Sequence, residues 1–172
     1  MGNLLSSSKE RKAKTKQGAG LQAVCLSAGD IKELQCIGYS DREHGKVRWK
    51  TLISSDKTPS KDLTAGIATL PPRKENQPTS AGGNMAPHRH RQAEVYIVVS
   101  GEAIINVDML EYPVSAGSVV FIPGGAERAV RNTSLTEEFV WYFCLAADKI
   151  GDVRFLYKND GIGVASQPRV MG

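Results

Sequence analysis

The stretch GGNMAPHRHRQAEVYIVVSG, residues 82–101, places two histidines two residues apart and a glutamate four residues after the second. Residues two apart on a strand point to the same side, so His88 and His90 project together. A turn after them lets Glu94 open the next strand and return to the same point. Two imidazoles and a carboxylate hold Fe(II), Mn, Ni or Zn and leave coordination positions open. We therefore expect a metal site at His88, His90 and Glu94; two histidines on an exposed strand are the alternative.

Short β-like runs surround this stretch. They are rich in Val, Ile and aromatic residues and are separated by Gly, Pro, Asp and Asn. No long helical period intervenes, so the pattern predicts an all-β fold, an antiparallel sandwich or barrel. A short helix or turn is expected over residues 148–155. The expected strands are 21–26, 47–54, 64–70, 94–99, 102–107, 118–122, 127–132 and 138–146.

Charge and length divide the chain into a tail and one domain. Residues 1–19 hold five basic residues and one acidic residue, which accounts for the whole net charge of +4. The tail has no apolar periodicity, so residues 1–20 are expected to be a disordered basic segment. A single domain is expected over 21–157, followed by a loose segment, 158–172. The neutral domain argues against a nucleic-acid-binding function.

The chain start fits the pattern M-G-x-x-x-[ST] for N-myristoylation, with Gly2 and Ser6 in place. One acyl chain binds membranes marginally, so the basic cluster would act as the second signal. A solvated terminus that matches by chance is the alternative, and we favour it. No apolar run approaches the roughly 20 residues of a spanning helix, and three widely spaced cysteines without CxxC are expected to be reduced and buried. We expect a cytoplasmic protein that reaches a membrane only through an acylated Gly2.

Two glycine-bounded motifs carry a family resemblance. The first, G-x5-H-x-H-x3-E-x6-G, resembles the first motif of the cupin superfamily and is formed by Gly82, His88, His90, Glu94 and Gly101. The second cupin motif, G-x5-P-x-G-x2-H-x3-N, is met over 117–132 by Gly117, Pro123, Gly125 and Asn132. The resemblance runs from about residue 45 to 147 and implies a double-stranded β-helix, a jelly-roll barrel with a metal inside. It does not specify the reaction, because cupins include dioxygenases, decarboxylases, isomerases, lyases and metal-free binders.

The second motif departs from the family where its histidine belongs, because this chain has Arg128 there. Arginine has no lone pair to give and cannot be a metal ligand. Three arrangements stay open: Arg128 faces inward and grips an anionic substrate oxygen, it pairs with Glu94 in a metal-free pocket, or it reaches the surface. We prefer the first. His44 lies in a loop-like stretch and is a weak substitute ligand, and strand alternation should point Glu127 away from Arg128's face.

Tyr96 lies two residues after Glu94 and shares its face, so it could donate a proton to a substrate, as inward tyrosines do in several cupin lyases. The alternative is a barrel-lining tyrosine bonded to backbone. Val95, Ile97 and Val99 form a second apolar face, which predicts that a second sheet or a partner subunit covers the strand. Small cupins often dimerise in this way, so we expect a homodimer. Residues expected in a core or an interface, and not in a substrate pocket, are Trp49, Trp141, Tyr142 and Phe143.

These features lead us to expect a metal-dependent cupin enzyme that acts on a small substrate. We favour an oxidoreductase with Fe(II), ahead of Mn, Ni or Zn, because three ligands leave most room for oxygen chemistry. Tyr96 and Arg128 would be catalytic, and Arg128 would favour an anionic or phenolic substrate. The chain is similar to stand-alone cupin oxidoreductases of fungal polyketide pathways, which implies secondary metabolism. A non-redox lyase, decarboxylase or isomerase and a metal-free ligand-binding cupin are the alternatives.

Overall fold

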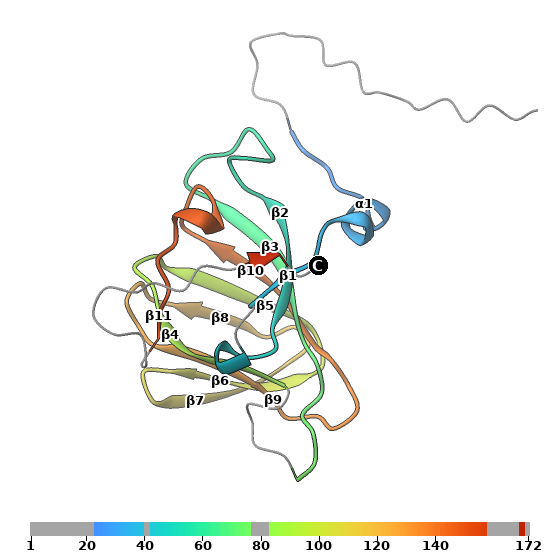
Figure 1. Ribbon diagram of the computed structural model, residues 1–172, viewed down its shortest axis with the longest axis vertical. Coiled ribbons are helices and arrows are strands. Elements are labelled where there is room, and N and C mark those ends of the chain that lie inside the picture. Colours follow the sequence, from blue (N-terminus) through green and yellow to red (C-terminus); the bar gives the residue numbers. More distant parts are fainter. Residues whose placement is uncertain (1–22, 40–41, 77–82, 158–168, 171–172) are drawn as a thin grey trace, which may run out of the picture.

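The computed structural model describes residues 23–39, 42–76, 83–157 and 169–170. It consists almost entirely of antiparallel strands in two sheets around a common core (Figure 1). The sheet orders are β12-β1-β2-β3-β10-β5-β8 and β11-β4-β9-β6-β7. The strands are β1 (Ile37–Gly38), β2 (Arg48–Ile53), β3 (Thr64–Leu70), β4 (Asn84–Arg89), β5 (Glu94–Ser100), β6 (Glu102–Val107), β7 (Leu110–Ser115), β8 (Val119–Ile122), β9 (Arg128–Asn132), β10 (Phe139–Leu145), β11 (Leu156–Tyr157) and β12 (Arg169–Val170). The predicted all-β barrel is confirmed.

Every strand expected from residue 47 onward is present, with ends that differ by at most one residue. The strand β4, whose bounds were not predicted, carries His88, and His90 follows one residue after its end. The strand β7 was not expected at all. It lies at the edge of its sheet, and its first four residues are exposed, so no alternation of buried and exposed residues marks it in the sequence.

The strand expected at 21–26 is wrong in its described part, because residues 23–26 are not in a strand. They lead instead to Ser27, which caps a short helix, α1 (Ala28–Glu33). The Asp30 N–H donates to Ser27 Oγ at 3.2 Å, and the Ser27 N–H donates to Asp30 Oδ2 at 2.8 Å. This capping box satisfies two amides that a helix start leaves free. The three cysteines are free thiols, as expected, but none is buried: Cys25 is exposed, and Cys36 and Cys144 are partly buried.

Two short 3-10 turns lie beside the aromatic residues at one side of the barrel interior. The turn η3 (Ile150–Asp152) lies within the helix or turn expected at 148–155. The turn η1 (Arg42–His44) places His44 beside the last strands of the described chain. Both turns lie next to aromatic residues of the barrel mouth and so help to enclose the interior.

Strand register decides which side chains enter the barrel. On β5 the buried residues alternate, so Glu94, Tyr96 and Val98 point inward. On β9 the same alternation buries Arg128 and Asn132. Since β4 pairs with β9 and sets His88 opposite Arg128, both motifs contribute to one interior. Alternation also turns Glu127 outward, where it lies 3.4 Å from Arg89, as predicted.

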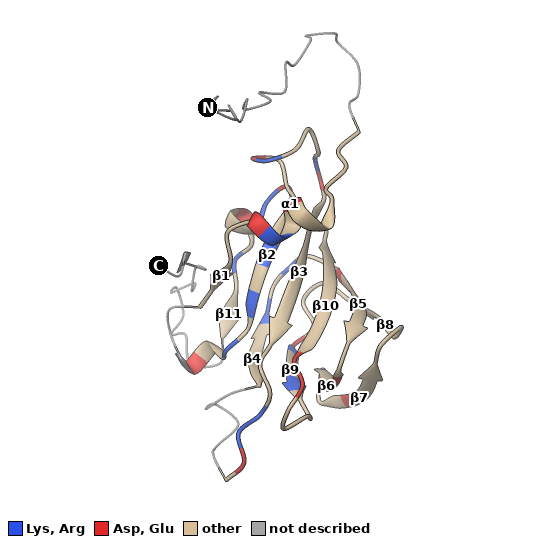
Figure 2. Ribbon diagram, turned by 90° about the vertical axis from the view of Figure 1, so that its right-hand side faces the viewer, with Lys and Arg blue, Asp and Glu red and all other residues tan. Residues whose placement is uncertain are grey.

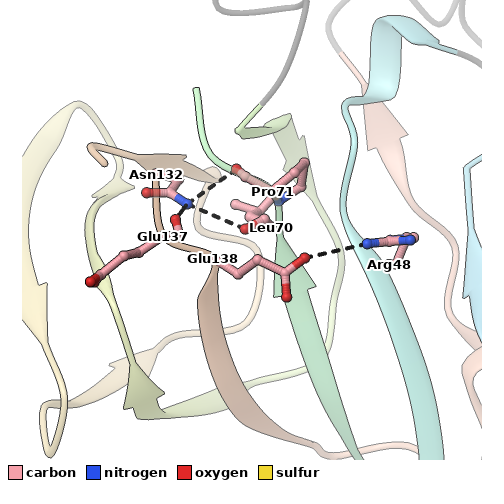
Figure 3. Close-up of polar contacts among 6 residues, drawn as sticks. All are labelled: Arg48, Leu70, Pro71, Asn132, Glu137 and Glu138. Carbon is pink, nitrogen blue, oxygen red and sulfur yellow. Dashed lines mark hydrogen bonds and ion pairs between the residues drawn. The ribbon is translucent and has the colours of Figure 1, made fainter. Parts of the chain in front are cut away.

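The Asn132 side chain joins the two sheets (Figure 3). It is fully buried, and its Nδ2 donates to the carbonyl oxygens of Leu70 at 3.2 Å, Pro71 at 3.1 Å and Glu137 at 2.8 Å. Its Oδ1 accepts from the Ser134 N–H at 2.9 Å. One side chain therefore satisfies the backbone where β3 ends and where β10 is about to begin.

The residues that the structure describes leave the outer face of β5 open. Ile97 and Val99 are 42% and 44% exposed, so neither of the two described sheets lies on them, and the expectation of a second sheet there is wrong for this part of the chain. The helix α1 covers only the other end of the same sheet, over β2 (Figure 2), where Lys50 Nζ donates to the Ile31 and Lys32 carbonyl oxygens at 3.0 and 2.6 Å. A partner subunit remains the predicted cover for β5.

Several sequence expectations fall outside the described residues. These are the basic tail with Gly2 and Ser6, the motif residue Gly82, and most of the segment 158–172. Among the residues that the structure describes, no helix is long and apolar enough to cross a membrane.

Candidate active site

A cavity of about 50 Å³ opens into the barrel between the two sheets. The predicted residues His88, His90, Glu94 and Tyr96 all lie on its wall. The rest of the wall is apolar or aromatic and consists of Tyr39, Val47, Trp49, Ala68, Met85, Trp141, Phe143, Leu145, Ile150 and Phe155. A concave apolar site with a few convergent polar groups is the usual form of a small-molecule site.

The two histidines are buried rings inside the barrel. Both are 2% exposed, and their ring centres lie 5.8 Å apart. His88 Nδ1 lies 2.9 Å from the Ala86 carbonyl oxygen, which favours the tautomer with the proton on Nδ1 and a lone pair on Nε2. Burial lowers the pKa of His88 to about 3, and the neighbouring His90 and Arg128 charges act in the same direction. His88 is therefore a neutral lone-pair donor at physiological pH.

The third predicted ligand, Glu94, lies close to one of these rings. Its Oε2 is 3.4 Å from His90 Nε2, and this buried oxygen has no hydrogen-bond donor. A buried carboxylate oxygen without a donor is costly unless a cation or another group satisfies it. The donor chemistry of Glu94, His88 and His90 thus suits a divalent cation.

The chemistry of these three side chains suits a metal ion, but their positions do not form a metal site. Among the described residues, no three His, Cys, Asp or Glu side chains form a group able to hold a metal ion. His90 Nε2 lies 3.4 Å from Glu94 Oε2, while the His88 ring packs against Phe155, with ring centres 5.7 Å apart. The metal site at His88, His90 and Glu94 therefore stays a prediction.

Tyr96 is 2% exposed and lies beside Glu94. Burial, followed by the charge of Glu94, raises the pKa of Tyr96 well above its ordinary value, and a side-chain hydrogen bond with Glu94 adds to the shift. The hydroxyl is therefore protonated at neutral pH and can donate to the Glu94 carboxylate. The sequence alternative, a tyrosine bonded only to backbone, does not describe this contact.

Arg128 points inward and is fully buried, so the arrangement in which it reaches the surface is excluded. Its Nη2 donates to the Pro123 carbonyl oxygen at 3.0 Å, while Nε and Nη1 have no partner. Burial lowers the pKa of the guanidinium, and the Glu94 charge opposes that shift. No Arg128–Glu94 ion pair occurs among the described residues, yet Arg128 does not line the cavity either. Its predicted role as a substrate anchor stays a prediction.

The turn of the second motif supports the loop that carries the histidines. The Gly125 N–H donates to the His90 carbonyl oxygen at 2.8 Å. A Cβ on Gly124 would collide with the Arg91 carbonyl oxygen, so only glycine fits at this approach. Gly125 itself has φ of +83°, which glycine adopts most readily. Pro123–Gly125 therefore forms a tight turn, which also positions His90.

Sequence reasoning missed several residues of the site. Tyr39 and Phe155 line the cavity from segments outside the two motifs, and Trp49, Trp141 and Phe143 serve both the core and the cavity wall. Their aromatic character was the only feature of the sequence that could have indicated them. His44 stacks on Tyr157 with ring centres 3.8 Å apart, and Tyr157 in turn lies 5.5 Å from His88. His44 is thus one ring removed from the histidine pair.

Comparison with known proteins agrees with this geometry. The cupin domain model matches residues 77–145, where both motifs lie. An RmlC-like cupin from Shewanella frigidimarina superposes with a TM-score of 0.54 at 18% identity, covering 77% of this chain and 98% of that one. The chain contains a cupin domain at residues 77–145. A second cupin-fold structure, a predicted oxalate decarboxylase from Thermotoga maritima, gives a TM-score of 0.55 at 20% identity, covering 68% of this chain and 96% of that one.

Two curated relatives extend the comparison. This cupin is 29% identical over 126 residues to the dimethylsulfoniopropionate lyase DddW of Ruegeria pomeroyi, covering 73% of this chain and 77% of that protein. It is 43% identical over 54 residues to an uncharacterized protein of Streptomyces coelicolor, which is 31% of this chain and 51% of that protein, about half its length. The first relative supports an enzymatic cupin in general and gives no support to an oxidoreductase.

Proposed function

We propose that this cupin is a non-redox lyase, which removes a proton from a small organic substrate and expels a group bonded through a heteroatom. The observation that carries the proposal is the buried Tyr96 hydroxyl on the cavity wall, bonded to the Glu94 carboxylate. Such a pair moves protons and needs no electron acceptor. The similarity to a lyase supports the same class of reaction.

Tyr96 and Glu94 work as a proton relay in this proposal. The Tyr96 oxygen takes a proton from a substrate carbon as its own proton passes to the Glu94 carboxylate. The electron pair of the broken C–H bond forms a C=C bond, and the bond to the heteroatom breaks with its pair on the leaving group. The apolar wall excludes water, which strengthens the interaction between the relay and the charge that develops.

A divalent metal is part of the proposal, with His88, His90 and Glu94 as its ligands. The neutral His88 ring and the unsatisfied Glu94 Oε2 are the observations in its favour. When bound, the metal would supply a Lewis acid that polarises a substrate oxygen. Fe(II), favoured for oxygen chemistry, has no special advantage in an elimination, so Mn, Ni or Zn serve equally. Metal content of the purified protein tests this part.

The lyase and oxidoreductase hypotheses predict different results when oxygen is removed from the assay. Dimethylsulfoniopropionate is the first candidate substrate, because elimination would release dimethyl sulfide, acrylate and a proton. Gas chromatography should show that the product forms equally fast with and without oxygen. Turnover of this or another small substrate only with stoichiometric oxygen uptake would favour the oxidoreductase, including one of a polyketide pathway. Tight binding without any turnover would favour the ligand-binding cupin.

A homodimer through the outer face of the β5–β8 end is a further part of the proposal. The large apolar side chains Ile97, Val99, Val119 and Phe121 are 42%, 44%, 65% and 63% exposed there. An exposed apolar patch of this kind marks an interaction site. Sedimentation should give twice the chain mass for the wild type and the chain mass for Phe121→Asp; monomeric wild type would rule out the dimer.

Membrane attachment through an acylated Gly2 is likewise a proposal, and a cytoplasmic protein is expected without it. The basic tail would supply the second, electrostatic signal. The chain coexpressed with an N-myristoyltransferase should float with acidic vesicles, and the Gly2→Ala variant should not. Equal behaviour of the two would leave the solvated-tail alternative.

A further inference from the structure

The two tryptophans of the chain lie in one row across three neighbouring strands. Trp49 on β2 and Trp141 on β10 are each paired with Ala68 on β3, the strand between them. Directly opposed residues of adjacent strands share a face, and all three side chains are buried on the cavity wall. Neighbouring strands lie about 4.8 Å apart, so the short Ala68 side chain leaves room between the two indoles. We call this space over Ala68 the tryptophan slot.

Aromatic neighbours fix each indole in place. Trp141 stacks on Phe139 with ring centres 5.1 Å apart and lies 5.6 Å from Tyr96. The ring centre of Trp49 lies 5.3 Å from that of Tyr39. Rings packed in this way keep their orientation, so the indole N–H groups need little rearrangement when a ligand enters.

The two indole N–H groups are donors without an acceptor. Trp49 Nε1 and Trp141 Nε1 are buried, and neither has a hydrogen-bond partner among the described residues. A buried tryptophan N–H usually finds a partner, because an unsatisfied donor has lost its contacts with water. An indole N–H can only donate, so the group that satisfies it is an acceptor. Two such donors on one cavity wall indicate a ligand oxygen.

We propose that Trp49 and Trp141 donate to a carbonyl-type oxygen of the substrate, in a ketone, ester or carboxyl group attached to the carbon that loses its proton. The inference rests on the proposed function, because it gives this pair a role in that reaction. Binding in the slot uses neither Glu94 nor the histidines, so it is compatible with a metal held by those residues. The cavity of about 50 Å³ restricts the bound group to a few heavy atoms.

The position of the pair suits an elimination. Trp141 lies beside Tyr96, the proposed base, so a carbonyl group in the slot brings the neighbouring C–H bond toward the Tyr96 hydroxyl. As Tyr96 takes the proton, part of the electron pair of the C–H bond moves onto the carbonyl oxygen. The pair then forms the C=C bond, and the leaving group departs with its own bonding electrons. Two N–H donors stabilise the negative charge that develops on the oxygen.

The indole signals report this contact directly, because the chain has only these two tryptophans. A proton–nitrogen correlation spectrum of the full chain contains two indole N–H signals, which Trp49→Phe and Trp141→Phe assign. Titration with propionate or with butanone should move both signals downfield with one dissociation constant. The isostere of butanone with a methylene group in place of oxygen should cause no downfield shift. A response to propionate alone selects a carboxylate substrate, and a response to butanone alone selects a neutral one. No downfield shift with either ligand would overturn the inference.

Replacement of the N–H groups without a change of shape tests their function. Biosynthetic substitution of benzothienylalanine for tryptophan puts sulfur in place of both N–H groups and alters no other residue. The ligand identified by titration should bind roughly tenfold more weakly. The kcat of the elimination should fall by roughly 10²-fold or more. An unfolding curve verifies that the fold is kept, and unchanged affinity in the folded, substituted protein would contradict the proposal.

A matched pair of variants tests the slot itself. Ala68→Val fills the space between the indoles, whereas Ala65→Val makes the same change on the opposite face of β3. Ala68→Val should weaken binding by roughly tenfold or more and abolish the indole shifts. Ala65→Val should retain both. Equal binding by the two variants would place the ligand outside the slot.

Binding and turnover separate this inference from the lyase. If propionate or butanone moves both indole signals and no substrate is turned over, the slot stands and the lyase fails. If Tyr96-dependent elimination runs at the full rate in the benzothienylalanine protein, the lyase stands and the role of the tryptophans fails.

Discussion

The two cupin motifs of this chain differ in what they retain. The motif on β4 and β5 brings His88, His90 and Glu94 to the cavity wall and adds Tyr96. The motif on β8 and β9 has its turn and its buried asparagine, but Arg128 stands where the cupin motif has a metal-binding histidine. The first motif holds the groups that can move protons or bind a cation, and the second holds the backbone in shape.

The contacts of the second motif give it a structural role that needs no metal-binding histidine. Its turn donates a hydrogen bond to the His90 carbonyl oxygen, and Asn132 links β9 to the ends of β3 and β10. Arg128 also serves the turn, since it donates to Pro123. A motif can thus stay recognisable for structural reasons after its chemistry has changed.

The largest expected effect on turnover is at the first motif, with Tyr96→Phe. The variant removes one hydroxyl and leaves the ring in its place, so the relay to Glu94 is broken while packing is kept. We expect turnover to fall by roughly 10²–10⁴-fold, as for other positioned proton-transfer groups. Steady-state kinetics with an unfolding curve as control measures both quantities. Unchanged turnover would assign the chemistry to other groups.

The next effect is expected at the contact between the motifs, with Gly124→Ala. A Cβ here would push the Arg91 carbonyl oxygen and so displace the adjacent His90. We expect turnover to fall by roughly 10-fold to 10²-fold, because small misplacements of reacting groups are costly. The matched control is Gly151→Ala, whose Cβ would meet no atom within 4 Å. If both variants retain full activity, the turn does not position the histidine loop.

The sequence predicted the fold well because strand alternation and turn residues act locally. Strands such as β6 are marked by their own residues, whereas β7, an exposed edge strand, has no alternating pattern to detect. The helix α1 was missed although Ser27 and Asp30 form a capping box, because the preceding apolar run suggested a strand. Local signals can therefore conflict, and here the helix cap at Ser27 decided the structure, not the strand propensity of the preceding residues.

The site was predicted only where its residues are close in sequence. His88, His90, Glu94 and Tyr96 lie within nine positions, so strand periodicity alone places them on one wall. Tyr39 and Phe155 reach the same cavity from positions more than a hundred residues apart, and no spacing rule connects them. The surroundings of Arg128 were equally beyond reach, because its Pro123 contact and its distance from the cavity depend on packing.

A smaller effect, on metal affinity, is expected from Arg128→His, which places a histidine where the second cupin motif has one. The side chain would then offer a lone pair in the interior opposite His88 on the neighbouring strand. We expect metal affinity to rise by roughly tenfold, which is the lower end of the change in affinity when a residue that supports a metal site is altered. Substrate affinity should fall if Arg128 anchors an anionic group. The control Arg128→Met removes the charge without adding a donor, and equal metal affinity in the two variants would show that position 128 faces no metal.

The smallest effect on turnover, and a large one on stability, is expected for Asn132→Ala. The substitution leaves the carbonyl oxygens of Leu70, Pro71 and Glu137 without their shared donor in a buried place (Figure 3). Buried groups left unsatisfied cost about 3 kcal/mol of unfolding free energy in total. Asn132 does not line the cavity, so turnover per folded molecule should stay within about twofold of wild type. Denaturant unfolding and kinetics at low temperature measure the two effects. A large loss of turnover in fully folded Asn132→Ala would show that the second motif contributes to the chemistry, and the division between a chemical motif and a structural motif would have to be abandoned.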